Sequence, residues 1–125
     1  MAVERPRGFE LWAKSNVWQR TIRLALRPWK LTHVQYLLLV TLADLEKRRD
    51  EPIRQADLAA EAKLDLMMTS QVIRSLEERG LLLRSPHPHD MRAFMIEPTP
   101  EGEKVLKGAR PAFEAAETAF WSESS

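Results

Sequence analysis

The chain has 125 residues, of which 44% are hydrophobic and 30% are charged, and these proportions indicate one globular domain rather than a fibre or a disordered tail. The absence of cysteine excludes disulfides, thiolate metal sites and thiol redox sensing, which fits a cytoplasmic protein. No apolar run approaches the roughly 20 residues of a membrane helix, and no signal peptide is visible. The net charge of +1 is low for a protein that binds nucleic acid. Residues 1–30 are strongly basic, whereas residues 66–98 are neutral.

The first predicted helix covers residues 9–27 and should end before Pro28, because an interior proline breaks a helix. One largely apolar stripe should face the core. This stripe consists of Leu11, Ser15, Trp18, Ile22, Ala25 and Leu26. Arg20, Arg23 and Arg27 form a separate basic strip. This strip is either a solvated face or a surface that contacts the acidic C-terminal segment, of the same chain or of the second chain of a dimer.

The second predicted helix begins after Thr32, because the side chains of Thr32 and Gln35 can each satisfy the other's free backbone N–H. This helix is apolar on nearly all sides, which is typical of a helix buried in the centre of a domain. A charged loop follows at residues 47–52, and Ile53 is expected to form a very short strand.

Residues 55–80 predict two helices joined by a tight turn, with Asp65 as the N-cap of the second helix and Gly80 as its end. The second helix has an apolar face and a polar face. The apolar face carries Thr69, Val72, Ile73 and Leu76, and the polar face carries Met67, Gln71, Arg74 and Glu78, with Ser70 beside them. Such a pair of helices can place the polar face of the second in a DNA major groove.

A β-hairpin should follow, with strands at residues 81–85 and 93–97. Its tip, residues 86–89, contains two prolines, so we expect it to be stiff and to remain unpaired. Asp90 lies two residues before Arg92 and is expected to stabilise this wing, in one of two ways. It either orients the Arg92 guanidinium for a narrow minor groove, or the two residues only hold the hairpin together.

The last predicted helix starts at Thr99, as N-cap, and Pro100. Apolar residues then recur in steps of three and four, which is a seam that requires a partner helix. The seam consists of Leu106, Ala109, Phe113, Ala116 and Phe120.

The sequence contains no motif of a catalytic site: there is no phosphate-binding glycine loop, nucleophile elbow or zinc-protease helix. His87, His89 and Asp90 are too crowded on a proline-rich tip to surround one ion, so we expect no metal site. We therefore expect neither enzyme activity nor a cofactor.

Several short motifs occur in a characteristic order. They are Leu58-Ala59, Leu64-Asp65, the run from Thr69 to Glu77, Arg79-Gly80-Leu81, the D-x-R motif Asp90-Met91-Arg92, and the run from Thr99 to Gly102. In this order they resemble the winged helix-turn-helix domain of the MarR family of transcriptional regulators. Two departures are Lys63, where many such units have glycine, and the methionines Met67 and Met68, where small polar residues are frequent.

The resemblance implies a mainly α fold with a small β-hairpin wing, in which residues 1–125 form a single domain. Residues 53–98 would be the DNA-binding part, and residues 8–30 and 99–121 would be flanking dimerisation helices. It also implies a homodimer that binds a palindromic operator in double-stranded DNA, as a repressor in our interpretation. A small, often aromatic effector would bind between the dimerisation helices and the DNA-binding part.

Nine residues are candidates for DNA contact: Arg54, Gln55, Met67, Met68, Ser70, Gln71, Arg74, His89 and Arg92. In the major groove, Gln pairs well with adenine, Arg with guanine and Met with thymine methyl groups. The alternative for the two methionines is packing within the protein. Arg54 and Gln55 precede or begin a helix, where contact with phosphates is favourable.

Five residues are candidates for an effector pocket: Trp12, Trp18, Trp29, His33 and Tyr36. The alternative is that these rings belong to the core, where large aromatic side chains are common. A second hypothesis for the whole chain is a winged-helix module that binds a protein partner and not DNA. The neutral charge of residues 66–98 permits both hypotheses.

Overall fold

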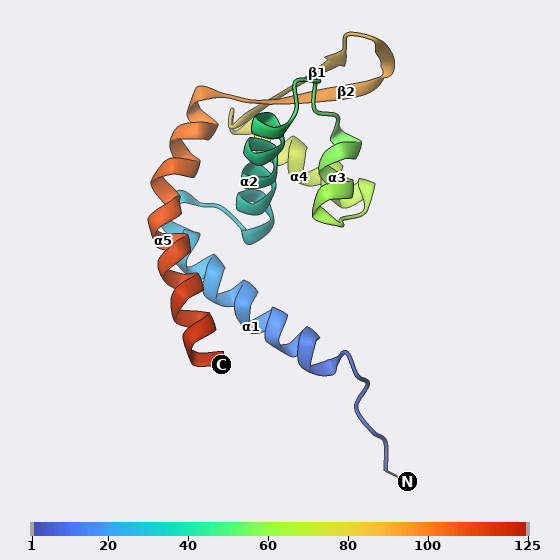
Figure 1. Ribbon diagram of the computed structural model, residues 1–125. Helices are drawn as coiled ribbons and strands as arrows, with labels where there is room; N and C mark the ends of the chain where they lie inside the picture. Colours follow the sequence, from blue (N-terminus) through green and yellow to red (C-terminus); the bar gives the residue numbers. More distant parts are fainter. Residues whose placement is uncertain (1, 125) are drawn as a thin grey trace.

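The computed structural model describes residues 2–124 and confirms a mainly α fold with a β-hairpin (Figure 1). In chain order, the elements are α1 (Phe9–Leu26), the 3-10 helix η1 (Arg27–Trp29), α2 (His33–Arg48), α3 (Gln55–Ala62), α4 (Leu66–Glu78), β1 (Leu82–His87), β2 (Asp90–Pro98) and α5 (Pro100–Ser124). In Figure 1, α1 and α5 lie together and extend away from the group formed by α2, α3, α4 and the hairpin. The hairpin projects at the end of the molecule opposite the two termini.

The ends of the helices follow from local sequence signals. Helix α1 ends at Leu26, and Pro28 falls in the short 3-10 turn, as expected. Lys30 then adopts a left-handed conformation (φ 55°) that turns the chain into α2. The predicted capping box of α2 is present: Gln35 N donates to Thr32 Oγ1 at 3.1 Å, and Thr32 N donates to Gln35 Oε1 at 2.9 Å.

Specific residues end α3, begin α4 and end α4 in the helix-turn-helix unit. Lys63 ends α3 in a left-handed conformation (φ 59°), which is the conformation that glycine adopts most readily. Asp65 caps α4 by accepting a hydrogen bond from Met68 N at 2.7 Å, as predicted. Gly80, with φ 72°, ends the segment, also as predicted.

The hairpin corrects one expectation. Residues 86–87 were expected to remain unpaired, but Pro86 lies opposite Phe94 and His87 lies opposite Asp90, so β1 runs through the first proline. A hairpin leaves one side of each strand without a neighbour, and a proline can direct its missing N–H to that side. The register shifts after Pro86, so residues 91–93 have no opposite residue in β1.

A short contact attaches the hairpin to the start of α3. Ile96 N donates to the carbonyl oxygen of Ile53 at 2.8 Å, and Arg54 pairs with Met95 in an isolated antiparallel bridge. Instead of the expected short strand at Ile53, an isolated bridge forms at the next residue, Arg54, and Ile53 contributes its carbonyl oxygen. This contact holds the wing next to the first helix of the helix-turn-helix unit.

The core is continuous from α1 to the hairpin and is centred on α2. Its largest fully buried side chains are Ile22, Leu26, Tyr36, Leu38, Leu42, Leu45, Leu58, Thr69, Ile73, Leu76 and Ile96. Helix α2 contributes side chains to contacts with α1, α3, α4, α5 and β2. Its expected position at the centre of the domain is confirmed.

Helix α5 is capped by Thr99, whose hydroxyl oxygen accepts from Gly102 N at 3.0 Å and donates to the carbonyl oxygen of Gly80 at 2.6 Å. The apolar seam of α5 packs in part on α1 of the same chain: Ala109 and Phe120 are buried and Phe113 contacts Trp18. The partner helix that the seam requires is thus supplied at least partly from within the chain.

The start of α5 packs closely on Leu81 at Gly102, and a substitution there tests this contact. A Cβ at Gly102 would lie 1.9 Å from the carbonyl oxygen of Leu81, so Gly102→Ala must displace backbone. We expect urea denaturation to show a loss of about 1–3 kcal/mol in the free energy of unfolding. Gly8→Ala is the matched control, because a Cβ there meets no atom within 4 Å, and it should cost less than about 1 kcal/mol. Equal stabilities of the two variants would contradict this view of the α5 start.

Candidate DNA-binding surface

Helix α4 presents its polar face outward. Thr69, Ile73 and Leu76 are buried, whereas Gln71 and Arg74 are exposed and Met67 is 75% exposed. The division into two faces follows from the 3.6-residue period of the sequence. The side chains at the N-terminal half of α4 are therefore available to a groove.

The neighbouring residues complete this surface. Ser70 is half-buried, and Met68 is 42% exposed, so neither Met67 nor Met68 packs in the interior of the chain. Leu66 is also exposed, although it is not among the predicted DNA-contact residues. Its position directly after the Asp65 N-cap was the available signal, because the first residue of an outward helix end meets solvent.

Helix α3, helix α4 and the wing meet around a shallow hollow of about 220 Å³. Its lining consists of Arg54, Gln55, Ala56, Leu66, Arg92, Ala93 and Phe94. Three predicted DNA-contact residues, Arg54, Gln55 and Arg92, are thus brought together from distant parts of the chain. The Gln55 Oε1 atom is buried, with no hydrogen-bond partner in the described part of the chain.

Asp90 holds the wing against α3 and differs in detail from the prediction. One carboxylate oxygen, Oδ2, lies 3.2 Å from Arg54 NH1, and the other, Oδ1, accepts a hydrogen bond from the backbone N of Arg92 at 3.1 Å. Of the two expected roles, the first, orientation of the Arg92 guanidinium, is not seen among the described residues, because Asp90 binds the Arg54 guanidinium. The contact of Asp90 with the Arg92 backbone fits the second role, in which the two residues hold the hairpin together. A carboxylate readily reaches the backbone two residues later, and the paired hairpin brings it over the start of α3.

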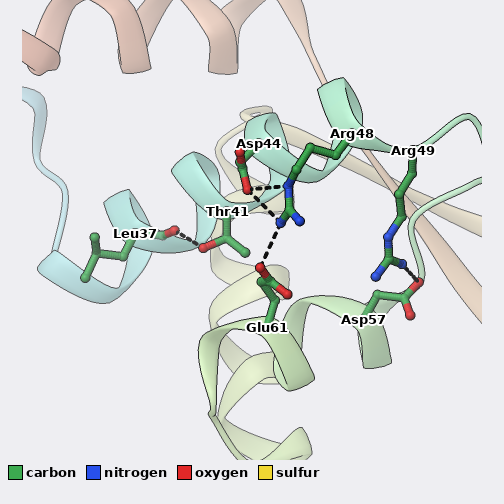
Figure 2. Close-up of polar contacts among 7 residues, drawn as sticks. All are labelled: Leu37, Thr41, Asp44, Arg48, Arg49, Asp57 and Glu61. Atoms are coloured by element: carbon green, nitrogen blue, oxygen red, sulfur yellow. Dashed lines mark hydrogen bonds and ion pairs between the residues drawn. The ribbon is translucent and has the colours of Figure 1, made fainter.

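Arginines at the end of α2 hold α3 from behind (Figure 2). Arg48 NH2 lies 2.8 Å from Asp44 Oδ2 and 2.8 Å from Glu61 Oε1 of α3. Arg49 NH1 lies 3.3 Å from Asp57 Oδ2, which also accepts a hydrogen bond from Arg54 N at 2.9 Å. These pairs are exposed, so their effect is on the position of α3 more than on global stability.

The tip of the wing carries two histidines with different surroundings. His87 is buried, and its Nδ1 accepts a hydrogen bond from His89 N at 3.1 Å, whereas His89 is exposed. Within residues 2–124, no group of histidine, aspartate and glutamate is arranged to hold a metal ion. The exposed His89 thus remains available at the end of the wing.

The candidate effector residues separate into two groups. Trp18, His33 and Tyr36 lie together around Phe113: the ring centroids of Tyr36 and Phe113 are 4.5 Å apart and stacked, and those of Trp18 and His33 are 6.4 Å apart, edge to face. These rings pack on one another as a core does. Trp12 and Trp29 lie elsewhere, since Trp12 is 61% exposed beside Phe9 and Trp29 lies against Gly108.

His33 has an unusual environment within that aromatic cluster. Its Nδ1 atom is buried, with no hydrogen-bond partner in the described chain. Burial, with a smaller effect from the positive charge of Arg23, lowers the pKa of His33 below its ordinary value. This environment favours the neutral form of the imidazole.

Helices α1 and α5 leave apolar side chains exposed. The exposed members are Leu11, Trp12, Val17, Leu24 and Trp121. We expected Leu11 to be in the core-facing stripe, but it is 75% exposed, because the start of α1 extends away from α2, α3, α4 and the hairpin (Figure 1). A hollow of about 200 Å³ between the two helices is lined by Leu11, Lys14, Ser15, Trp18, Phe120 and Trp121. The basic strip Arg20, Arg23 and Arg27 is exposed, as a solvated face would be.

An outward second helix, a hairpin beside it and a capped turn between α3 and α4 define a winged helix-turn-helix protein. The sequence pattern of the MarR family matches residues 31–94. The chain is 36% identical over 115 residues to the HTH-type transcriptional regulator YdcH of Bacillus subtilis (strain 168), a match that covers 92% of this chain and 78% of that protein. The chain belongs to the MarR family.

Solved structures agree with this assignment. CouR from Rhodococcus jostii RHA1, in complex with p-coumaroyl-CoA, is 26% identical, with a TM-score of 0.78 over 97% of this chain and 81% of CouR. MepR of S. aureus, in a DNA complex, has the same fold, with a TM-score of 0.83 at 21% identity over 98% of this chain and 87% of MepR. The sequence-based family assignment is thereby confirmed. MarR-family proteins are transcriptional regulators and not enzymes, in agreement with the sequence analysis.

Helices long and apolar enough to cross a membrane do not occur among residues 2–124.

The contacts of Asp90 predict a local role. In Asp90→Ala, Arg54 loses its ion pair and the Arg92 N–H loses its acceptor, so the Arg92 amide should exchange faster in hydrogen-exchange NMR. The free energy of unfolding should fall by less than about 1 kcal/mol, because the pair is exposed. Asp44→Ala removes an ion pair of similar exposure and should leave the Arg92 amide unchanged. Unchanged exchange in Asp90→Ala would contradict this role.

The environment of His33 predicts a pH effect. The lowered pKa means that the unfolded chain binds this proton more readily than the folded chain. Stability should be complete above the ordinary value of 6.5 and should decline as the pH falls below it. We expect urea unfolding at about pH 7.5 and about pH 5 to show a smaller decline for His33→Gln than for the wild type. An equal decline in stability of His33→Gln and the wild type would contradict this effect of His33.

Proposed function

We propose that this MarR-family regulator is a sequence-specific repressor that binds a palindromic operator in double-stranded DNA as a homodimer. The observation that carries the proposal is the outward face of α4, on which Gln71 and Arg74 are exposed while Ile73 and Leu76 fix the helix from behind. Such a regulator works in the cytoplasm, where bacterial chromosomal DNA lies.

In this proposal, α4 reads the major groove. Gln71 and Arg74 form bidentate hydrogen bonds with base edges, Ser70 assists, and Met67 and Met68 contact thymine methyl groups. The exposure of both methionines supports this role. Helix α4 also has the marked two-sided character of a recognition helix, since Thr69, Ile73 and Leu76 of its inner face are buried.

The wing and the start of α3 contact the flanking DNA. Arg92 and His89 reach the minor groove from the tip, where a narrow groove attracts positive charge. Gln55 and Arg54 contact phosphates beside the hollow that they share with Arg92. Arg54 has donors beyond the one that binds Asp90, because a guanidinium carries five N–H groups.

The dimer is formed by α1 and α5. The exposed Leu11, Trp12 and Trp121 give these helices an apolar surface of the kind that a second copy covers. A two-fold dimer would present two α4 helices to two half-sites of an inverted repeat.

An effector that binds among Trp18, His33 and Tyr36 would release the DNA. This aromatic cluster lies where α1, α2 and α5 meet. CouR, which is similar in sequence and fold, was solved with p-coumaroyl-CoA, a ligand with an aromatic acyl group. Trp12 and Trp29 lie elsewhere and are not part of this site.

Selection of random duplexes on the purified chain tests the proposal, together with its mass in solution. We expect an inverted repeat and the mass of a dimer. Affinity for the selected duplex should fall steeply with salt, because phosphate contacts release counterions. Recovery of no inverted repeat would overturn the proposal.

Arg74→Ala should weaken binding to the selected duplex by about 1–3 kcal/mol and relax the preference at one base pair of each half-site. Arg92→Ala should weaken binding and lower the salt dependence of the affinity. Lys104→Ala, an exposed charge on α5, is the control and should have little effect. Fluorescence anisotropy at several salt concentrations gives both quantities. Wild-type binding by both arginine variants would remove the roles assigned to them.

One observation favours a second candidate function. Leu66, Met67 and Met91 are exposed, and Leu66 also lines the hollow between α3, α4 and the wing. Exposed apolar side chains are typical of protein-binding surfaces. A protein-interaction module that does not bind DNA would enrich no inverted repeat. The selection of random duplexes therefore separates the two functions.

A further inference from the structure

The C-terminal end of α4 is fastened to the turn between α1 and α2 by Arg79. Its NH1 donates to the carbonyl oxygen of Lys30 at 2.8 Å, and its NH2 donates to the carbonyl oxygen of Trp29 at 2.9 Å. The planar guanidinium donates to two neighbouring carbonyl oxygens, and this pair of bonds fixes both the orientation of the guanidinium and its distance from the turn. Arg79 thus connects the recognition helix with the segment that leads out of α1.

Further contacts surround this joint. Gln35 Nε2 donates to Ser75 Oγ at 3.1 Å, which joins α2 to the last turns of α4. The Gly80 carbonyl oxygen accepts from the Thr99 hydroxyl at 2.6 Å, which joins the end of α4 to the start of α5. The joint is therefore made of α4, the α1–α2 turn and α5.

The receiving side of the joint is itself tightly placed. Lys30 adopts a left-handed conformation, so its carbonyl direction is set by a turn that few conformations allow. The Trp29 ring lies so close to Gly108 of α5 that a Cβ there would be 3.2 Å from Trp29 Nε1. A change in the approach of α1 and α5 would thus move the two carbonyl groups that hold Arg79.

We propose that Arg79 is a positioning residue that sets the angle of α4 relative to the dimerisation helices, and through it the half-site spacing that the dimer selects. This inference rests on the proposed homodimeric operator binding. It assigns to Arg79 no contact with DNA.

The geometry gives the joint leverage. Helix α4 has 13 residues, so its two ends are about 18 Å apart at a rise of about 1.5 Å per residue. The joint lies at the C-terminal end, and the base-reading side chains lie in the N-terminal half. A tilt of about 10° at the joint would displace the N-terminal end by about 3 Å, close to one base-pair step of the roughly 34 Å repeat of DNA.

The test measures affinity for a series of duplexes in which the two selected half-sites are moved apart or together by one and two base pairs. A duplex with a single half-site reports the intrinsic reading of α4. The wild type should show a sharp optimum at one spacing. Arg79→Met should flatten it: affinity at the optimum should fall about 5–10-fold more than affinity at the shifted spacings, with single-site affinity within about 2-fold of the control.

The control is Lys104→Met, which removes the same charge from an exposed position. Arg79→Lys should restore part of the optimum, because an ammonium group can reach one of the two carbonyl oxygens. Arg79→Lys also tests the positioning role if Arg79→Met does not fold, because the spacing optimum of Arg79→Lys should be broader than that of the wild type. Thermal melts monitor folding.

The failures are distinguishable. A wild type without any spacing preference would overturn the proposed dimeric operator binding. A sharp wild-type optimum that Arg79→Met and Arg79→Lys retain would overturn the positioning role alone. A parallel loss of affinity at every spacing and at the single site would also overturn it, because that pattern belongs to a direct phosphate contact.

Discussion

The structure depends on the burial of the apolar side chains of α2. Leu38, Leu42 and Leu45 are almost completely inaccessible, and the helix touches α1, α3, α4, α5 and β2. Full burial of an aliphatic side chain of this size contributes about 1.5–3 kcal/mol, so these residues stabilise the fold substantially. The same helix therefore supports the recognition helix on one side and the α1–α5 pair on another. A movement in one part is transmitted to the other through packed side chains, because a close-packed core has little free volume.

The distribution of arginines explains how a chain with a net charge of +1 can present a DNA-binding surface. Residues 66–98 are neutral, yet their charges are not equivalent. Arg84 is paired with Glu77 at 3.7 Å and lies over the Phe94 ring, and Arg79 is bound to backbone carbonyl groups. Arg74 and Arg92 are exposed, one on α4 and one on the wing. The positive charge available to a ligand is thus small in amount and specific in position.

Local signals made most of the fold predictable from the sequence. The capping box at Thr32, the N-cap at Asp65 and the positive φ at Gly80 depend on neighbouring residues, and each was found as predicted. The outward face of α4 followed from helical period alone. The contacts that could not be predicted join distant segments. The pairing of Asp90 with Arg54 requires the hairpin to lie over α3, and the Arg79 contact requires α4 to end beside the α1–α2 turn. No spacing in the sequence encodes either.

The shifted register of the hairpin has a consequence for how such a wing can vary. Met91, Arg92 and Ala93 have no opposite residue in β1. Below them, residues 82–86 remain paired with residues 94–98. Side chains in a paired strand alternate between two faces, so a change of length there would reverse every residue beyond it. A bulged stretch is free of that constraint. Related chains could therefore lengthen, shorten or redirect the arginine-bearing end of the wing while the ladder beneath it, and the helices that the ladder contacts, remain as they are.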